Sequence, residues 1–91
     1  MKKHVSITVH GKVQKVGFRF SAIDKAIEWE LVGEVKNYEA DKVQIEVEGE
    51  EENLQKFLKW CHVGPQGAVI EKVDYTSTEE LQNYETFKGE W

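Results

Sequence analysis

The segment that organises this sequence is residues 11–19, which read GKVQKVGFR and lie between a strand pattern and a helix pattern. Before it, Val5, Ile7 and Val9 alternate with polar residues, as in a half-buried strand. After it, apolar residues recur every three or four positions, as on one face of a helix. A glycine-containing loop at the start of a helix directs several backbone N–H groups into one concavity, which suits a phosphate group. We therefore predict an anion-binding loop between the first strand and the first helix.

The first helix is predicted to run to about Glu30, and a hairpin is predicted to follow it. The expected apolar face of the helix consists of Phe20, Ile23, Ile27 and Leu31, with Ala22 and Ala26 beside them. Residues 32–37 and 43–47 both show strand character, and residues 38–41 form the expected turn between them.

A second helix is predicted to begin at residues 50–52, where three glutamates suit the positive end of a helix dipole. Its expected core face consists of Leu54, Phe57, Leu58 and Cys61. Residues 64–67, which read GPQG, end the helical pattern. Residues 69–75 then predict a fourth strand, and residues 84–87 are a candidate for a short last one. The order βαββαβ predicts one α+β domain over residues 1–91, a ferredoxin-like sandwich whose antiparallel sheet carries two helices on one face.

The charge distribution favours a focused anion site over a broad nucleic-acid surface. The formal net charge is −5, yet residues 1–20 contain five basic side chains and no acidic one. The chain has no apolar run of the roughly 20 residues that a membrane span needs, and its amino end lacks a signal-peptide pattern. A single cysteine allows no internal disulfide. We expect a cytoplasmic protein without membrane or nucleic-acid partners.

Two motifs in the first half of the chain carry a family resemblance. The pattern V-Q-x-V-x-F-R occupies residues 13–19, and G-x-V-x-N occupies residues 33–37. Further matching positions are Lys36, Val43, Gly49, Phe57, Gly64 and Pro65. With these motifs in this order and at this separation, residues 5–75 resemble the acylphosphatase family.

The resemblance implies a small enzyme that hydrolyses acyl phosphates to a carboxylate and orthophosphate without a metal or another cofactor. Arg19 would bind the phosphoryl group, and Asn37 would orient the attacking water. The loop amides implied in phosphate binding are those of Gln14, Lys15, Val16, Gly17 and Phe18. The implied partners are a small-molecule acyl phosphate and inorganic phosphate, and the expected state is a monomer. An acyl phosphate has a good leaving group, so positioning and charge stabilisation suffice for catalysis.

The sequence also departs from the family pattern. Lys15 stands where a loop glycine is usual, Glu30 where the helix usually ends in glycine, and Ala40 with Asp41 replaces an Asp-Gly turn. Residues 87–91, which read FKGEW, lack the common isoleucine-arginine-tyrosine ending. These changes keep open a catalytically silent phosphate- or anion-binding module of the same fold.

Other functional classes have little support in the sequence. An RNA-binding ferredoxin-like domain would need an aromatic strand, whereas residues 42–48 read KVQIEVE. His4, His10 and His62 show no metal-ligand spacing, and we expect no metal site. Cys61 falls at a core position of the second helix, which indicates packing rather than catalysis.

Overall fold

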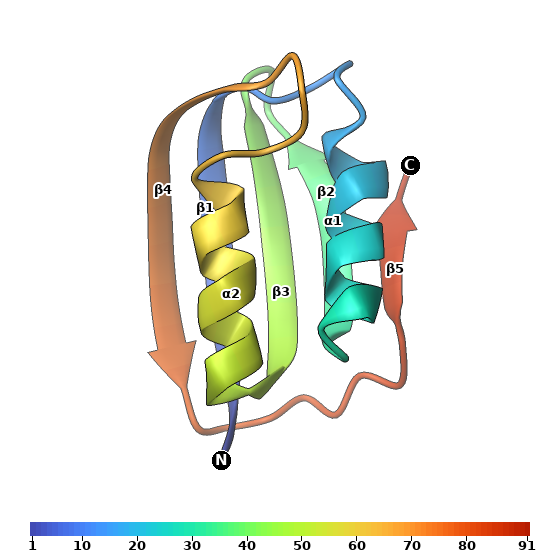
Figure 1. The fold of residues 1–91 in the computed structure, drawn as a ribbon, viewed down its shortest axis with the longest axis vertical. Helices are drawn as coiled ribbons and strands as arrows, with labels where there is room; N and C mark the ends of the chain where they lie inside the picture. Colours follow the sequence, from blue (N-terminus) through green and yellow to red (C-terminus); the bar gives the residue numbers. More distant parts are fainter.

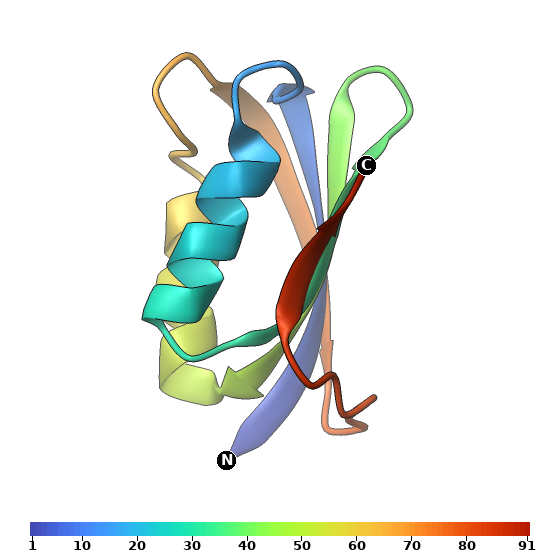
Figure 2. The same cartoon turned by 90° about the vertical axis from the view of Figure 1, so that its right-hand side faces the viewer.

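The protein is a five-stranded sheet covered on one face by two helices (Figures 1 and 2). The computed structural model describes all residues from Met1 to Trp91. Its elements are β1 (Lys2–Lys12), α1 (Phe18–Glu28), β2 (Val32–Tyr38), β3 (Lys42–Glu50), α2 (Glu51–Cys61), β4 (Val69–Thr78) and β5 (Phe87–Glu90). The predicted βαββαβ order and the ferredoxin-like α+β fold are confirmed.

The sheet has the strand order β4-β1-β3-β2-β5 and is mixed rather than wholly antiparallel. β1 pairs antiparallel with β3 and β4, and β2 pairs antiparallel with β3, as predicted. β5 instead pairs parallel with β2, from Gly33 opposite Phe87 to Lys36 opposite Glu90. The chain leaves β4 at the lower end of the sheet in Figure 1 and passes beneath it to the far edge, so β5 runs in the same direction as β2. The last strand therefore covers residues 87–90 and not the predicted 84–87.

The core lies between the sheet and the two helices. Val5, Ile7 and Val9 of β1 lie opposite Val47, Ile45 and Val43 of β3, and the alternation of β1 turns these apolar residues toward the helices. On α2, Leu54, Phe57 and Cys61 are buried as predicted, and Leu58 is half-buried.

The predicted core face of α1 was wrong for Phe20 and Ile27, whereas Ile23 packs against the core and Leu31, just after the helix, is buried. The buried residues of this helix are Phe18, Ala22 and Ala26, whereas Phe20 and Ile27 are 65% and 63% exposed. Residues 18, 22 and 26 repeat every fourth position and so share one side of the helix. Two of them are alanines, whose small side chains let the helix approach the sheet closely. Alanine gives a weaker hydrophobic signal in the sequence than the larger apolar residues nearby.

Helix α1 ends two residues before the predicted Glu30, in a left-handed turn. Glu30 has φ 56°, and the amides of Glu30 and Leu31 donate to the carbonyls of Ile27 and Ala26 at 3.1 and 2.8 Å. This pair of hydrogen bonds is the Schellman arrangement, in which glycine is the favoured residue at the left-handed position. Glu30 therefore adopts a strained backbone conformation that glycine would adopt without strain.

A buried ion-pair network holds the segment between β4 and β5 on the open face of the sheet. His4 lies between two carboxylates, with Nδ1 2.7 Å from Glu48 and Nε2 2.6 Å from Glu46. Two carboxylate acceptors favour the charged imidazolium, in which both ring nitrogens donate, and they raise the pKa of His4. Glu48 also accepts hydrogen bonds from the backbone amides of Gln82 and Asn83, at 2.5 and 3.0 Å. This network therefore fixes the path that leads the chain to β5.

Candidate functional site

The loop between β1 and α1 lies beside the carboxyl end of β2, at the upper end of the molecule in Figure 1. A hollow of about 170 Å³ opens there. Its lining residues are Val13, Lys15, Gly17, Phe18, Arg19, Phe20 and Asn37. The structure thus brings Arg19 and Asn37, from the two sequence motifs, to one place.

Two residues of the loop adopt the left-handed conformation. Lys15 has φ 63° and Gly17 has φ 76°. Glycine takes this conformation freely, whereas a residue with a side chain loses on the order of 1 kcal/mol. Gly17 precedes α1 as its N-cap, and no side chain caps this end of the helix. A left-handed residue followed by a helical one forms the kind of concavity, or nest, in which successive N–H groups converge.

The backbone N–H groups of residues 14–20 have no acceptor among the backbone carbonyls. The first amide that does is that of Ser21, which donates to the carbonyl of Gly17 at 3.0 Å. Unpaired donors at the start of a helix carry the positive end of its dipole and form a ready anion site. The loop can therefore supply several convergent donors to one bound anion.

Gln14 has a structural role that the sequence did not reveal. Its side-chain Nε2 donates to the backbone carbonyls of Glu39 and Lys42, at 2.7 and 2.9 Å. This ties the loop to the turn between β2 and β3. Glu39 in that turn has φ 56°, and the Lys42 ammonium bonds its carboxylate at 2.6 Å. The hairpin that lacks an Asp-Gly turn is thus supported by side chains.

Arg19 lies in the first turn of α1 and is held by the residues at the end of β5. Its Nη1 donates to the carbonyl of Glu90 at 2.9 Å, and its Cζ lies 4.4 Å from the centroid of the Trp91 ring. Sequence reasoning missed both contacts because they depend on the parallel pairing of β5 with β2. The sequence offered little signal for these contacts, because Trp91 lies four residues beyond the predicted last strand and directly follows only the observed one.

Asn37 is placed by the alternation of β2. Val35 is fully buried against the helices, and a residue two positions later faces the same side of the sheet. Asn37 pairs with Val43 near the end of the strand, beyond the main core, and its half-buried side chain lines the hollow. Its carboxamide therefore reaches the site from the sheet, while Arg19 reaches it from the helix.

Of the remaining predicted binding residues, Val16 differs from its neighbours. Lys15, Gly17 and Phe18 line the hollow, whereas the Val16 side chain packs against the hydrophobic core. Its side chain anchors the loop, and only its backbone amide remains for an anion. Gln14 is likewise absent from the lining and supports the loop from outside.

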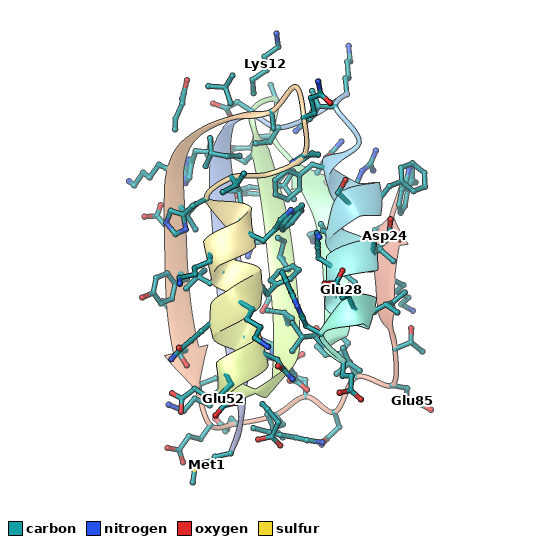
Figure 3. The ribbon with its side chains drawn as sticks, in the orientation of Figure 1. Met1, Lys12, Asp24, Glu28, Glu52 and Glu85 are labelled. Carbon is teal, nitrogen blue, oxygen red and sulfur yellow. The ribbon has the colours of Figure 1, made fainter.

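The charges around the hollow suit an anion. Lys15 and Arg19 are the charged residues of its lining, and no acidic residue is among them. Figure 3 shows Lys12 at this end of the molecule, with Glu52 and Glu85 at the opposite end. A larger hollow of about 310 Å³ lies at that opposite end, and its lining includes Glu30, Glu48 and Glu50. Its acidic lining would repel a phosphate, so size alone does not identify the site.

Cys61 and the histidines lie outside the site. Cys61 is completely buried in α2, and burial raises the pKa of its thiol, which suppresses the reactive thiolate. No group of three or more His, Cys, Asp or Glu side chains is arranged to hold a metal ion. No helix is long and apolar enough to cross a membrane.

Comparison with known proteins relates both the sequence and the fold to one family. The acylphosphatase family profile matches residues 5–89. An acylphosphatase from Trichormus variabilis is 37% identical over 87 residues, which cover 93% of this chain and 84% of the relative. One from Clostridium acetobutylicum is 38% identical over 88 residues, which cover 97% of both chains. The crystal structure of acylphosphatase from Bacillus subtilis superposes with a TM-score of 0.95 at 30% identity, over 98% of this chain and 99% of that one.

The sequence match extends beyond the two motifs to almost the whole chain, and the fold agrees from β1 to β5. Family and fold together support hydrolysis of acyl phosphates and do not favour a catalytically silent module. This chain belongs to the acylphosphatase family.

Proposed function

We propose that Arg19 and the loop amides bind the phosphoryl group of an acyl phosphate while Asn37 holds the attacking water. The observation that carries the proposal is the shared hollow, which Arg19 and Asn37 line from different elements. In the proposed reaction the water oxygen bonds to phosphorus in line with the breaking bond to the acyl oxygen. The carboxylate leaves, the water loses a proton, and orthophosphate remains.

Phosphate binding is assigned to the donors of the loop and the first turn of α1. The amides of Gln14, Lys15, Val16, Gly17 and Phe18, together with the Arg19 guanidinium, offer dipoles and a full positive charge to the phosphoryl oxygens. Phosphoryl transfer spreads negative charge over these oxygens, and fixed donors in a shielded site stabilise that charge. The Arg19 fork adds two parallel N–H groups of the geometry that phosphate favours.

The water is assigned to Asn37 because its carboxamide is neutral. A carboxylate at this position would repel the bound phosphate, whereas the amide oxygen accepts one hydrogen bond from water without adding charge. Asn37 extends from the sheet and Arg19 from the helix, so a phosphoryl group between them could meet the water on one side. The acyl leaving group is a stabilised carboxylate, and the proposed reaction needs neither a metal nor another cofactor.

The test is benzoyl phosphate hydrolysis by the purified protein with EDTA present. We expect turnover in the wild type, at least about a thousand-fold lower kcat/KM in Arg19→Ala, and about a hundred-fold lower kcat in Asn37→Ala. Arg19→Ala should also lose binding of inorganic phosphate, whereas Asn37→Ala should keep it. Asn53→Ala is the matched control, because Asn53 lies by the opposite hollow.

Two results would contradict the assignment. If a folded Asn37→Ala enzyme keeps most of its rate, Asn37 does not position the attacking water. A folded wild type that binds phosphate without turnover would restore the silent anion-binding module as the better description.

We also propose that residues 1–91 act as one cytoplasmic domain and as a monomer. The proposed site draws its named side chains from a single chain, which supports activity without a second copy. Sedimentation equilibrium on active protein tests the monomer, and a dimer under assay conditions would contradict it. Fractionation of cells that express the protein tests the compartment.

A further inference from the structure

Glu90, the last residue of β5, and Trp91, which follows it, hold the Arg19 side chain. The Arg19 guanidinium lies over the Trp91 ring, 4.4 Å from its centroid, and Nη1 bonds the Glu90 carbonyl at 2.9 Å. The Trp91 ring also packs against Phe20, whose ring centroid lies 5.0 Å away at an interplanar angle of 54°. The Trp91 ring is thus in contact with two consecutive residues of α1 that both line the hollow.

Gly89 provides the space in which the Trp91 ring lies. A methyl group at position 89 would overlap ring atoms of Trp91, so the ring rests where only a glycine leaves room. β5 itself is fixed by its parallel pairing with β2, including Val35 opposite Gly89. The position of the ring is therefore set by the sheet that also carries Asn37.

The two contacts orient Arg19 without cancelling its charge. They use one face of the guanidinium and one of its five N–H groups, and the others remain for an anion. Arg19 makes no ion pair, because its hydrogen-bond acceptor is a neutral carbonyl and its stacking partner is an aromatic ring. A long side chain that is ordered before binding loses less conformational entropy when the anion arrives.

We propose that Trp91 is a positioning residue, whose indole face holds the Arg19 guanidinium in the orientation that binds the phosphoryl group. This proposal rests on the proposed role of Arg19 in phosphate binding. Trp91 itself touches no reacting atom and acts on binding through Arg19. It is 64% exposed, so it adds little to the core and its role lies at the site.

The test compares phosphate binding by calorimetry and benzoyl phosphate kinetics in four substituted proteins. Exposed cation–π pairs correspond to about a two- to five-fold effect on binding. Trp91→Ala should raise the phosphate Kd and the KM by about that factor, with a much smaller change in kcat and in Tm. Trp91→Phe keeps an aromatic face and should recover most of the loss. Gly89→Ala retains the tryptophan but displaces its ring, and should resemble Trp91→Ala.

Trp29 offers a matched control. Its ring also stacks with a cation, Lys25 Nζ, at 5.6 Å from the centroid, but it packs against the core away from the hollow. Trp29→Ala should lower Tm and leave the phosphate Kd unchanged. Phosphate should also change the tryptophan fluorescence of the wild type and of Trp29→Ala, and not that of Trp91→Phe.

Each outcome separates this proposal from the proposed function. Unchanged or tighter phosphate binding in Trp91→Ala, while the wild type binds and hydrolyses normally, would overturn only the role of Trp91. An equal loss in Trp91→Phe and Trp91→Ala would also overturn it, because the aromatic face would then be irrelevant. A folded wild type that binds no phosphate would overturn both.

Discussion

The side-chain amide of Gln14 lies 2.7 Å from the carbonyl oxygen of Glu39, across the gap between the β1–α1 loop and the β2–β3 turn. A second bond, to the carbonyl of Lys42, closes the same bridge at 2.9 Å. The loop that offers the amides and the strand that carries Asn37 are therefore fastened together by one glutamine. The relative positions of the two proposed functional groups depend on this bridge.

Gln14→Leu removes both hydrogen bonds while keeping the size of the side chain. Each bond contributes about 0.5–1.5 kcal/mol, so we expect a loss of about 1–3 kcal/mol in the free energy of unfolding. Because the loop and Asn37 lose their common anchor, kcat/KM for benzoyl phosphate should also fall. Urea denaturation and steady-state kinetics measure the two effects.

Gln44→Leu is the control for that variant. The Gln44 side chain also makes two hydrogen bonds, with Thr8 at 2.7 Å and with Glu46 at 3.1 Å, but on the open face of the sheet. It should lose stability and keep kcat/KM. An equal loss of activity in both variants would show that Gln14 acts only through global stability.

Lys15→Gly tests the strain in the anion-binding loop. The left-handed φ of 63° costs lysine about 1 kcal/mol or more, and the added chain entropy of glycine offsets part of the gain. We expect stability to rise by up to about 1 kcal/mol in urea denaturation. Since the glycine also removes a cation from the lining of the hollow, phosphate binding should weaken. Stronger phosphate binding in Lys15→Gly would mean that the lysine side chain obstructs the hollow.

Glu30→Gly tests the same backbone conformation away from the site. Glu30 occupies the left-handed position of the turn that ends α1, with φ 56°. Glycine there should raise the free energy of unfolding by about 0.5–1 kcal/mol. It should leave the kinetics of benzoyl phosphate hydrolysis unchanged. A destabilised Glu30→Gly protein would show that the glutamate side chain contributes more than its backbone costs.

The His4–Glu48 pair predicts a pH dependence of stability. Burial alone would lower the pKa of His4, but its hydrogen bonds to Glu48 and Glu46 outweigh burial and raise that pKa above 6.5. Burial alone would raise the pKa of Glu48, but its bonds from the Gln82 amide and from His4 outweigh burial and lower that pKa below 4.5. The His4 contribution is complete below its unfolded pKa and is lost as pH rises through the folded one. The Glu48 contribution is present above its unfolded pKa and is lost as pH falls through the folded one.

The contribution of this pair should therefore be largest between roughly pH 4.5 and 6.5 and should decline above that range. His4→Gln removes it, so the stability difference between wild type and variant should shrink as urea denaturation is repeated from pH 6 to pH 9. His10→Gln is the control, because His10 meets Asp74 at 3.0 Å on an exposed edge. A difference that stays constant with pH would contradict a charged His4.

The sequence predicted the features that depend on residues near one another in the chain, and it missed those that depend on contacts between distant segments. Alternation of Val5, Ile7 and Val9 reports only local geometry, and the order of elements follows from such local patterns. The two motifs pointed to Arg19 and Asn37 through the family resemblance, and the structure brings both residues to one hollow. Lys15, noted in the sequence as standing where a loop glycine is usual, has the left-handed conformation that glycine favours.

The features that were missed depend on contacts between distant segments. The parallel pairing of β5 requires knowledge of where the chain passes after Thr78, and this path depends on the network around Glu48. The contact of Arg19 with Trp91 follows from that pairing. Phe20 and Ile27 were assigned to the buried face of α1 because they are large and apolar, whereas the helix packs on the sheet through Phe18, Ala22 and Ala26.

The parallel return of β5 also has a consequence for the order in which the protein assembles. Pairing β5 with β2 closes a much longer segment than forming the β2–β3 hairpin, so its entropic cost is larger and we expect it to form later. Arg19 is held by Glu90 and Trp91, so its final orientation waits for that step. A refolding chain should regain its helices and most of its sheet before it binds phosphate with full affinity. The competence of the site is thus a late event in folding, although the loop that contains it is among the first segments of the chain.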